Sequence, residues 1–281
     1  RTLVPTRPAS RNGITHLVDA SFTPEQDELR AQARAFLEAN PAPSWEQLAE
    51  LGWTGVSVAE ADGGTDLGFV EQGVLHEELG RALTPGPFYS TVAVALPALP
   101  AEEQRRVAAG ETSWALALGP LVPDLDTVER VAVVGGDGIY ELVGAEREML
   151  ETNDETRPLG ILAGGAIGER MAGSEVLADI RRRSLTALAL EACGAGRRAL
   201  ELAVEYVSQR EQFGRPIGSY QAVAHPLATS YMELELARSL AIWAAWCIDA
   251  GDAQAQTAAA AAKSQAADAA ANVGAGDTAP G

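Results

Sequence analysis

The feature that most constrains this chain is a short break at residues 210–219, between two long segments of apolar helical periodicity at about 176–209 and 220–250. Gly214 and Pro216 interrupt the helix, so two helix ends meet where backbone groups lack internal partners. Arg210 and Phe213 lie in the same few residues. Arginine can form two parallel hydrogen bonds to a pyrophosphate, and a phenyl ring can stack on an adenine. The break therefore suits a ligand with phosphate and a flat heterocycle, but on these residues alone a solvated turn is the commoner case.

The rest of the chain divides by its periodicity. Helical patterns are predicted at 23–39, 44–51, 70–83 and 89–99. Strand patterns at 113–118, 131–134, 139–143 and 159–163 predict a module of four to six strands. Two long helices follow, with Tyr206 and Tyr231 expected to face inward, and then an alanine-rich helix capped by Asp252 that reaches about residue 272. This order predicts an α+β fold without βαβ alternation.

Four regions are expected from this pattern. Residues 1–20 have no hydrophobic signal core and are interpreted as a disordered extension. A helical domain covers 21–110, and a reduced β domain covers 111–175. A helical bundle covers 176–281, and its last part is expected to be incomplete.

Composition excludes several classes of function. The formal net charge of −18 argues against nucleic acid and anionic membranes as partners, because both require clustered cations. No apolar run approaches the ~18 residues of a membrane span, so a cytoplasmic protein is predicted. Cys193 and Cys247 lie in apolar helical patterns, which is typical of buried thiols in a reducing compartment. The three histidines are far apart in the sequence, and no metal site is predicted.

The glycine-rich stretches do not indicate a dinucleotide-binding βαβ unit. Gly194 and Gly196 lie inside a helical pattern, do not follow a strand, and are explained by close helix packing. Residues 135–138 form the turn of a predicted hairpin. A Rossmann fold is therefore excluded.

The break also matches a known pattern, Tyr206-x-x-x-Arg210-x-Gln212-Phe213-Gly214-x-Pro216-Ile217-x-x-Tyr220-Gln221-x-x-x-His225. This string resembles the signature at the start of the C-terminal helical domain of acyl-CoA dehydrogenases. A second block resembles the N-terminal helical domain of that family in order and spacing: Leu48-Ala-Glu-Leu-Gly52-Trp53-x-Gly55, Gly63-Gly64 and Glu77-Glu78-Leu79-Gly80-Arg81-Ala82. The two blocks together span most of the chain.

The resemblance implies FAD as the cofactor, lying across a subunit interface. Arg210 would bind the pyrophosphate of a flavin that the neighbouring subunit mostly holds. The adenine end would be lined by Phe213, Ile217 and Tyr220, with Gln212 and Gln221 as hydrogen-bonding supports. His225 receives no catalytic role.

The reaction that the resemblance implies is α,β-dehydrogenation of an acyl-CoA thioester, in which a carboxylate removes the α-proton. One family position for that base falls on Ser184, and the other lies beyond residue 272. Glu191, two turns further along the helix, matches a position that is usually structural. Gly119-Pro120 stands where the family has a Thr/Ser-Glu-Pro element, and the glycine-serine-aspartate loop that should follow is absent. No catalytic residue is therefore identified.

Three hypotheses follow. The first is an oxidoreductase subunit of a hetero-oligomer, such as a heterotetramer, whose second acyl-CoA dehydrogenase-like subunit supplies the base and the substrate pocket. Actinobacterial enzymes with shortened subunits that act on steroid side-chain thioesters in β-oxidation are similar, so the substrate would be an acyl-CoA of the steroid-CoA type. The second is a complete homo-oligomeric enzyme whose base lies in a C-terminal segment outside this sequence. The third is a non-enzymatic scaffold that has lost flavin.

Overall fold

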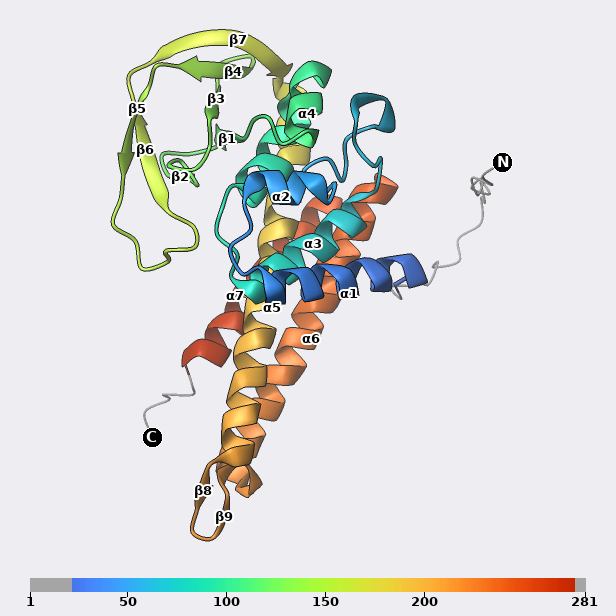
Figure 1. The fold of residues 1–281 in the computed structure, drawn as a ribbon, viewed down its shortest axis with the longest axis vertical. Helices are drawn as coiled ribbons and strands as arrows, with labels where there is room; N and C mark the ends of the chain where they lie inside the picture. Colours follow the sequence, from blue (N-terminus) through green and yellow to red (C-terminus); the bar gives the residue numbers. More distant parts are fainter. Residues whose placement is uncertain (1–21, 276–281) are drawn as a thin grey trace.

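The computed structural model describes residues 22–275, and the extension expected at 1–20 lies outside them. Helices α1 to α3 cross the upper part of a long helix pair, α5 and α6, and the sheets lie beside them (Figure 1). The lower ends of α5 and α6 project away from the rest and end in a small hairpin (Figure 1). We call this projecting part, residues 197–236, the arm.

The N-terminal helices begin at the capping residues that the sequence predicts. Thr23 and Ser44 each form a capping box, with Gln26 and Gln47 respectively. The helices are α1 (Pro24–Ala39), α2 (Trp45–Glu50), η1 (Glu60–Asp62), α3 (Phe69–Ala82) and α4 (Ala101–Ala108). The helix expected at 89–99 is instead a π-helix, η2 (Tyr89–Ala95), followed by a 3₁₀ turn, η3 (Leu96–Ala98). Pro97 explains its early end, because proline has no N–H to continue the helical ladder.

The β module contains two sheets. The strands are β1 (Trp114–Ala117), β2 (Val122–Pro123), β3 (Arg130–Val134), β4 (Gly138–Val143), β5 (Glu146–Met149), β6 (Leu159–Ala163) and β7 (Ala166–Gly173). One sheet has the order β1-β3-β4-β7 with β1 and β3 parallel, and the other has the order β2-β6-β5. The module has seven strands within the described residues 111–175, so the expected four to six is too few. The sequence pattern misses β2, which has only two residues, and it misses β5 and β7 because most of their residues are exposed and polar or small.

The C-terminal helices are α5 (Leu177–Gln209), α6 (Gln221–Ala250) and α7 (Ala255–Ala275), with η4 (Ser174–Val176) before α5. Between α5 and α6 lie β8 (Glu211–Gln212), β9 (Arg215–Pro216) and η5 (Ile217–Ser219). Gly194 and Gly196 provide the predicted close packing. A Cβ on Gly194 would lie 2.0 Å from the carbonyl oxygen of Glu77, and one on Gly196 would lie 3.3 Å from the Cα of Ala270. No helix within the described part of the chain is long and apolar enough to span a membrane.

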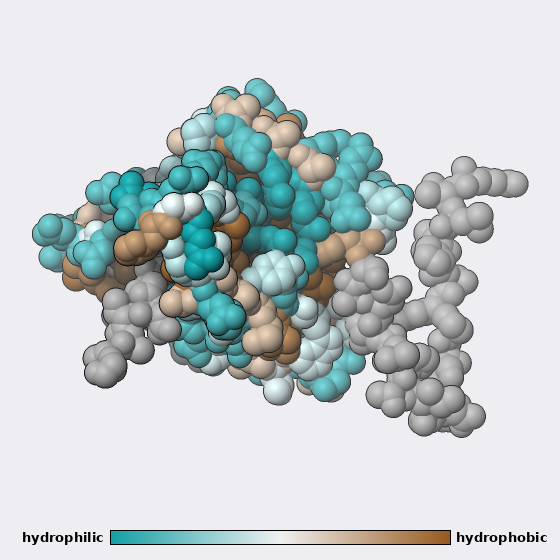
Figure 2. Space-filling view, turned by 90° about the horizontal axis from the view of Figure 1, so that it is seen from below, coloured by the Kyte–Doolittle hydropathy of each residue, from teal (hydrophilic) through white to brown (hydrophobic). Residues whose placement is uncertain are grey.

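Burial changes abruptly along α5. Most side chains between Ser184 and Gly196 are buried, whereas Leu200 is the last buried residue of the helix. Tyr206 and Tyr231, expected to face inward, are 61% and 53% exposed. That expectation is wrong because α7 and α3 pack only on the upper parts of α5 and α6, as Figure 1 shows, and the arm extends beyond them. Figure 2, which views the molecule from the arm end, shows brown apolar residues among teal polar ones.

Candidate functional site

The predicted break forms a β-hairpin at the tip of the arm. Strands β8 and β9 pair antiparallel, and the two residues between them, Phe213 and Gly214, have φ angles of 55° and 82°. Positive φ at both central residues matches a two-residue hairpin turn. Glycine adopts this conformation readily, whereas phenylalanine does so only under strain. The turn presents the Phe213 ring to solvent, and its side chain is 92% exposed.

Tyr220, the residue before α6, contacts β8 of the hairpin and the turn between its two strands. Its hydroxyl donates to the carbonyl oxygen of Gln212 at 3.1 Å, and its ring meets Phe213 edge to face with 6.5 Å between centroids. The Arg215 guanidinium lies 4.0 Å from the centroid of the Tyr220 ring. The Phe213 ring nevertheless remains open to solvent.

Arg210 ends α5 beside the hairpin. Its backbone N–H donates to the carbonyl of Tyr206 and its carbonyl accepts from the N–H of Ile217, both at 2.8 Å. Its side chain is exposed and pairs with no acidic group among residues 22–275. Gln212 and Gln221 are exposed, and Ile217 is half-buried. The hairpin and its junction with α6 thus contain all six predicted cofactor-binding residues, together with a second cation, Arg215, that the motif leaves unspecified.

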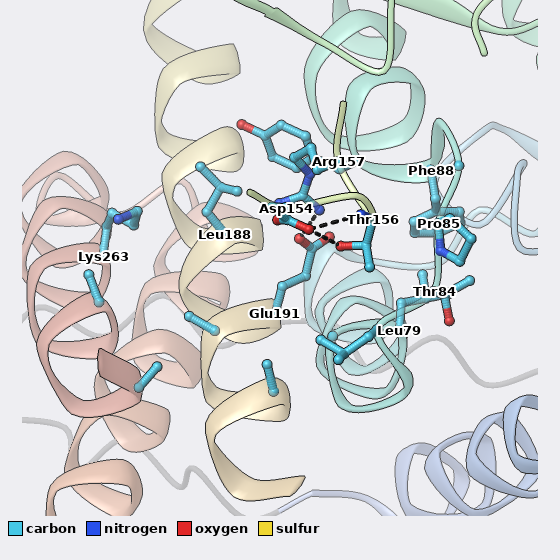
Figure 3. A pocket seen from close by; sticks show the side chains of 18 residues that line it. Leu79, Thr84, Pro85, Phe88, Asp154, Thr156, Arg157, Leu188, Glu191 and Lys263 are labelled. Carbon is cyan, nitrogen blue, oxygen red and sulfur yellow. Dashed lines mark hydrogen bonds and ion pairs between the residues drawn. The ribbon is translucent and has the colours of Figure 1, made fainter. Parts of the chain in front are cut away.

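A second candidate region lies near the other end of α5. The α3–α5–α7 cavity has a volume of about 340 Å³. Its walls come from the end of α3 with the loop that follows, from the loop before β6, and from α5 and α7 (Figure 3). Its lining includes Leu79, Thr84, Pro85, Phe88, Tyr89, Asp154, Thr156, Arg157, Leu188, Glu191, Ala192, Ala195, Lys263, Ala267 and Ala270.

Ser184, where the resemblance places a catalytic carboxylate, forms part of a buried hydroxyl pair. Its Oγ lies 2.6 Å from the hydroxyl oxygen of Tyr89, and Ser184 is 8% exposed. Burial raises the pKa of Tyr89 to about 12, so the phenol stays neutral at physiological pH. Neither hydroxyl is a base for an α-proton.

Glu191 is the centre of a buried charge cluster. Its Oε1 lies 2.8 Å from Nδ1 of His76 on α3, and its Oε2 pairs with Arg157 from the loop before β6. The Arg157 guanidinium also lies 4.8 Å from the centroid of the Tyr89 ring. Burial by itself raises the pKa of Glu191, but Arg157 and His76 outweigh that effect and the pKa is lowered. Glu191 is therefore a fixed counter-ion, which agrees with the structural role that its sequence position predicts.

Asp124 is a perturbed acid that sequence reasoning did not single out. It follows β2 with a φ of 58°, is 1% exposed, and accepts a 2.5 Å hydrogen bond from the hydroxyl of Ser90. Its Oδ1 is buried and has no hydrogen-bond partner among the described residues. Burial raises the pKa of Asp124 to about 7. Asp124 does not line the cavity, and no sequence motif marks it because its environment is assembled from separate segments.

The two regions are far apart within one chain. Glu191 and Arg210 are separated by 19 residues of α5, which corresponds to roughly 28 Å at 1.5 Å per residue. The hairpin and the cavity of the same chain thus cannot contact one small ligand together.

Comparisons with known proteins agree on one family. The family model described as "Acyl-CoA dehydrogenase, N-terminal domain" matches residues 16–106, and "Acyl-CoA dehydrogenase, C-terminal domain" matches residues 182–276. FadE28 of Mycobacterium tuberculosis, an acyl-CoA dehydrogenase, is 30% identical over 84% of this chain and 80% of its own length. Acyl-CoA dehydrogenase IpdE2 of the same organism is 33% identical over 70% of this chain, and the match spans 63% of IpdE2.

Solved structures show the same fold. The Tcur3481-Tcur3483 steroid ACAD G363A variant superposes with a TM-score of 0.78 and 30% identity, over 89% of this chain and 84% of that one. The ChsE4-ChsE5 complex from Mycobacterium tuberculosis also gives a TM-score of 0.78, at 21% identity over 91% of this chain and 86% of that one.

Proposed function

This chain belongs to the acyl-CoA dehydrogenase family, whose members are flavin-dependent oxidoreductases acting on CH–CH bonds, and on that premise we propose that it is one subunit of a heteromeric acyl-CoA dehydrogenase. In this proposal its arm reaches across the interface to a flavin that a partner subunit mostly holds. The partner supplies the base that removes the α-proton. A thioester of a bulky steroid-derived acid is the inferred substrate of the assembly, because one of the similar structures is that of a steroid ACAD.

The proposal rests on the exposure of the hairpin side chains and on their lack of charge pairing within the described part of the chain. Phe213 is 92% exposed, and the Arg210 side chain has no acidic partner within residues 22–275. A ring beside a free guanidinium fits the adenine and the pyrophosphate of FAD, with Arg215 as a further cation. When bound, FAD supplies the hydride acceptor of the reaction. The residues of this chain would hold and orient the nucleotide end of that cofactor.

The carboxylates of the cavity support the proposal that the base belongs to the partner subunit. The two carboxylates that line it, Asp154 and Glu191, both have a lowered pKa. Hydrogen bonds from Thr156 lower the pKa of Asp154, and the pairing with Arg157 and His76 lowers that of Glu191 in spite of its burial. A base for α-proton removal needs the opposite shift, toward neutral pH. Neither carboxylate is suited to that step.

The Arg210→Ala variant tests the proposal in the complex of this chain with its partner subunit. Removing a charge-assisted contact worth about 1.5–3 kcal/mol should weaken flavin retention at least about tenfold. Flavin absorbance per complex after dialysis measures this loss. Arg198→Ala is the matched control, because Arg198 is likewise an exposed arginine but lies within α5, outside the hairpin. Unchanged flavin content in Arg210→Ala would contradict the proposed role of the hairpin.

The same preparations separate the alternatives. Flavin and acyl-CoA oxidation in this chain purified without a partner would favour a complete homo-oligomeric enzyme. Flavin only in the co-expressed complex supports the proposal. No flavin in either preparation would indicate a scaffold.

A further inference from the structure

Lys263 is the single lysine of the chain, and its other 20 basic residues are arginines. It lies half-buried on α7 and lines the α3–α5–α7 cavity, beside Ala267 and Ala270 of the same helix. Within residues 22–275 no acidic group pairs with it and no hydrogen bond reaches it. An ammonium group partly removed from water with no counter-ion is costly, and a bound anion would offset that cost.

The other charges of the cavity are already engaged. Arg157 pairs with Glu191 and lies over the Tyr89 ring, and Asp154 accepts hydrogen bonds from the backbone N–H and the hydroxyl of Thr156 at 2.9 and 2.6 Å. Figure 3 shows Lys263 on the opposite side of Leu188 from these groups. Among the described residues, the cavity therefore has one free cation at its α7 side and two carboxylates at its other side.

The wall between these ends is apolar. It is lined by Leu188, Ala192 and Ala195 from α5 and by Ala267 and Ala270 from α7. The volume of about 340 Å³ lies at the lower end of the range for small-molecule sites, roughly 300–1,000 Å³. A compact ammonium can pair with a carboxylate as a point charge, and the alanine wall leaves room for a short hydrocarbon.

We propose that the α3–α5–α7 cavity binds a small monocarboxylate with an apolar body, and that Lys263 is the partner of its carboxylate. The apolar body lies along Leu188 and the alanines of α5 and α7. The carboxylates of Asp154 and Glu191 at the far side disfavour a ligand with a second negative charge. This site is separate from the hairpin and does not depend on the role proposed for Arg210.

Calorimetric titration of the full chain, or of its co-expressed complex, with octanoate and with octan-1-ol tests this site. Octanoate should bind the wild type more tightly than the alcohol of equal length. Lys263→Met should weaken octanoate binding about tenfold or more and leave the alcohol unaffected, because it removes the charge and keeps the side-chain length. Gln265→Met is the matched control, as an α7 residue that does not line the cavity, and it should bind octanoate like the wild type.

Lys263→Arg keeps the charge and guards against a folding defect, which circular dichroism of each variant also detects. It should retain octanoate binding within a few-fold of the wild type. Equal affinity of the wild type for octanoate and octan-1-ol, or undiminished octanoate binding by folded Lys263→Met, would overturn the assignment.

Discussion

The two halves of α5 differ in the burial and the charge pairing of their side chains. In the upper half, Glu191 is buried and its carboxylate oxygens are taken by His76 and Arg157. In the lower half, Tyr206 is 61% exposed, and Arg210 after the last turn has no acidic partner among the described residues. The Glu191 carboxylate is thus paired within one chain, whereas the side chains of Tyr206 and Arg210 remain exposed.

This difference shows which side chains of the helix are available to bind a ligand or a partner. A buried pair that satisfies itself contributes a fixed geometry and has little left for a ligand. An exposed ring and an exposed guanidinium on a hairpin can still stack on, and hydrogen-bond to, a cofactor or a partner. The arm is thus the part of the molecule for which an intersubunit role is proposed, and substitutions in the two halves of α5 should have opposite consequences.

Glu191→Gln should destabilise the chain by about 3–5 kcal/mol, because it leaves Arg157 and His76 without their shared anion in a buried setting. Urea unfolding followed by circular dichroism measures the loss. Glu205→Gln on the exposed arm of the same helix is the control and should change stability by less than about 0.5 kcal/mol. Equal losses of unfolding free energy in the two variants would contradict the expected difference between the buried and the exposed half of α5.

Asp124 should make stability depend on pH near neutrality. Its folded pKa of about 7 lies above the ordinary value of 3.8, so its stabilising contribution is full below about pH 4 and is lost as pH rises through 7. Between pH 5 and pH 8 the wild type should lose about 2–3 kcal/mol more than Asp124→Asn, which does not titrate. Unfolding free energies of both proteins at each pH measure this difference. Parallel pH curves would show that Asp124 is not held protonated by its burial.

Gly214→Ala should have the smallest effect on stability, about 1 kcal/mol, because a side chain at a φ of 82° is strained although nothing lies within 4 Å of it. The effect on flavin should be clearer, since the turn that presents Phe213 is distorted. Thermal unfolding and flavin content of the complex are the two measurements. Full flavin retention in a variant with an altered hairpin would show that the Phe213 ring does not contribute to cofactor binding.

The sequence predicts some elements of this molecule better than others. Thr23 and Ser44 mark the starts of α1 and α2 because capping is a local interaction, and Gly194 marks close packing because only glycine permits that approach. The exposed strands β5 and β7 are missed because pairing with neighbours, and not apolar alternation, holds them. The inward orientation expected for Tyr206 is wrong because periodicity identifies an apolar face but not what covers it.

The candidate sites divide in the same way. The hairpin is a local motif, so its residues from Arg210 to Gln221 can be read in order along the chain. The cluster of His76, Arg157 and Glu191 combines a helix, a loop and another helix, and no spacing rule links positions so far apart. Lys263 is noticeable in the sequence only as a single lysine, and its place in a cavity appears only in the folded chain.

By itself the sequence determined the family, the order of helical and β regions, and the composition of the hairpin, since each depends on residues that are close in the chain or on a recurring pattern. The tertiary structure alone decided which groups remain available. It closes Glu191 into an ion pair, holds Asp124 where burial raises its pKa, leaves Lys263 without a partner among the described residues, and carries Arg210 and Phe213 to the end of the arm. Burial and charge pairing depend on contacts between distant segments, and those contacts exist only after the chain has folded.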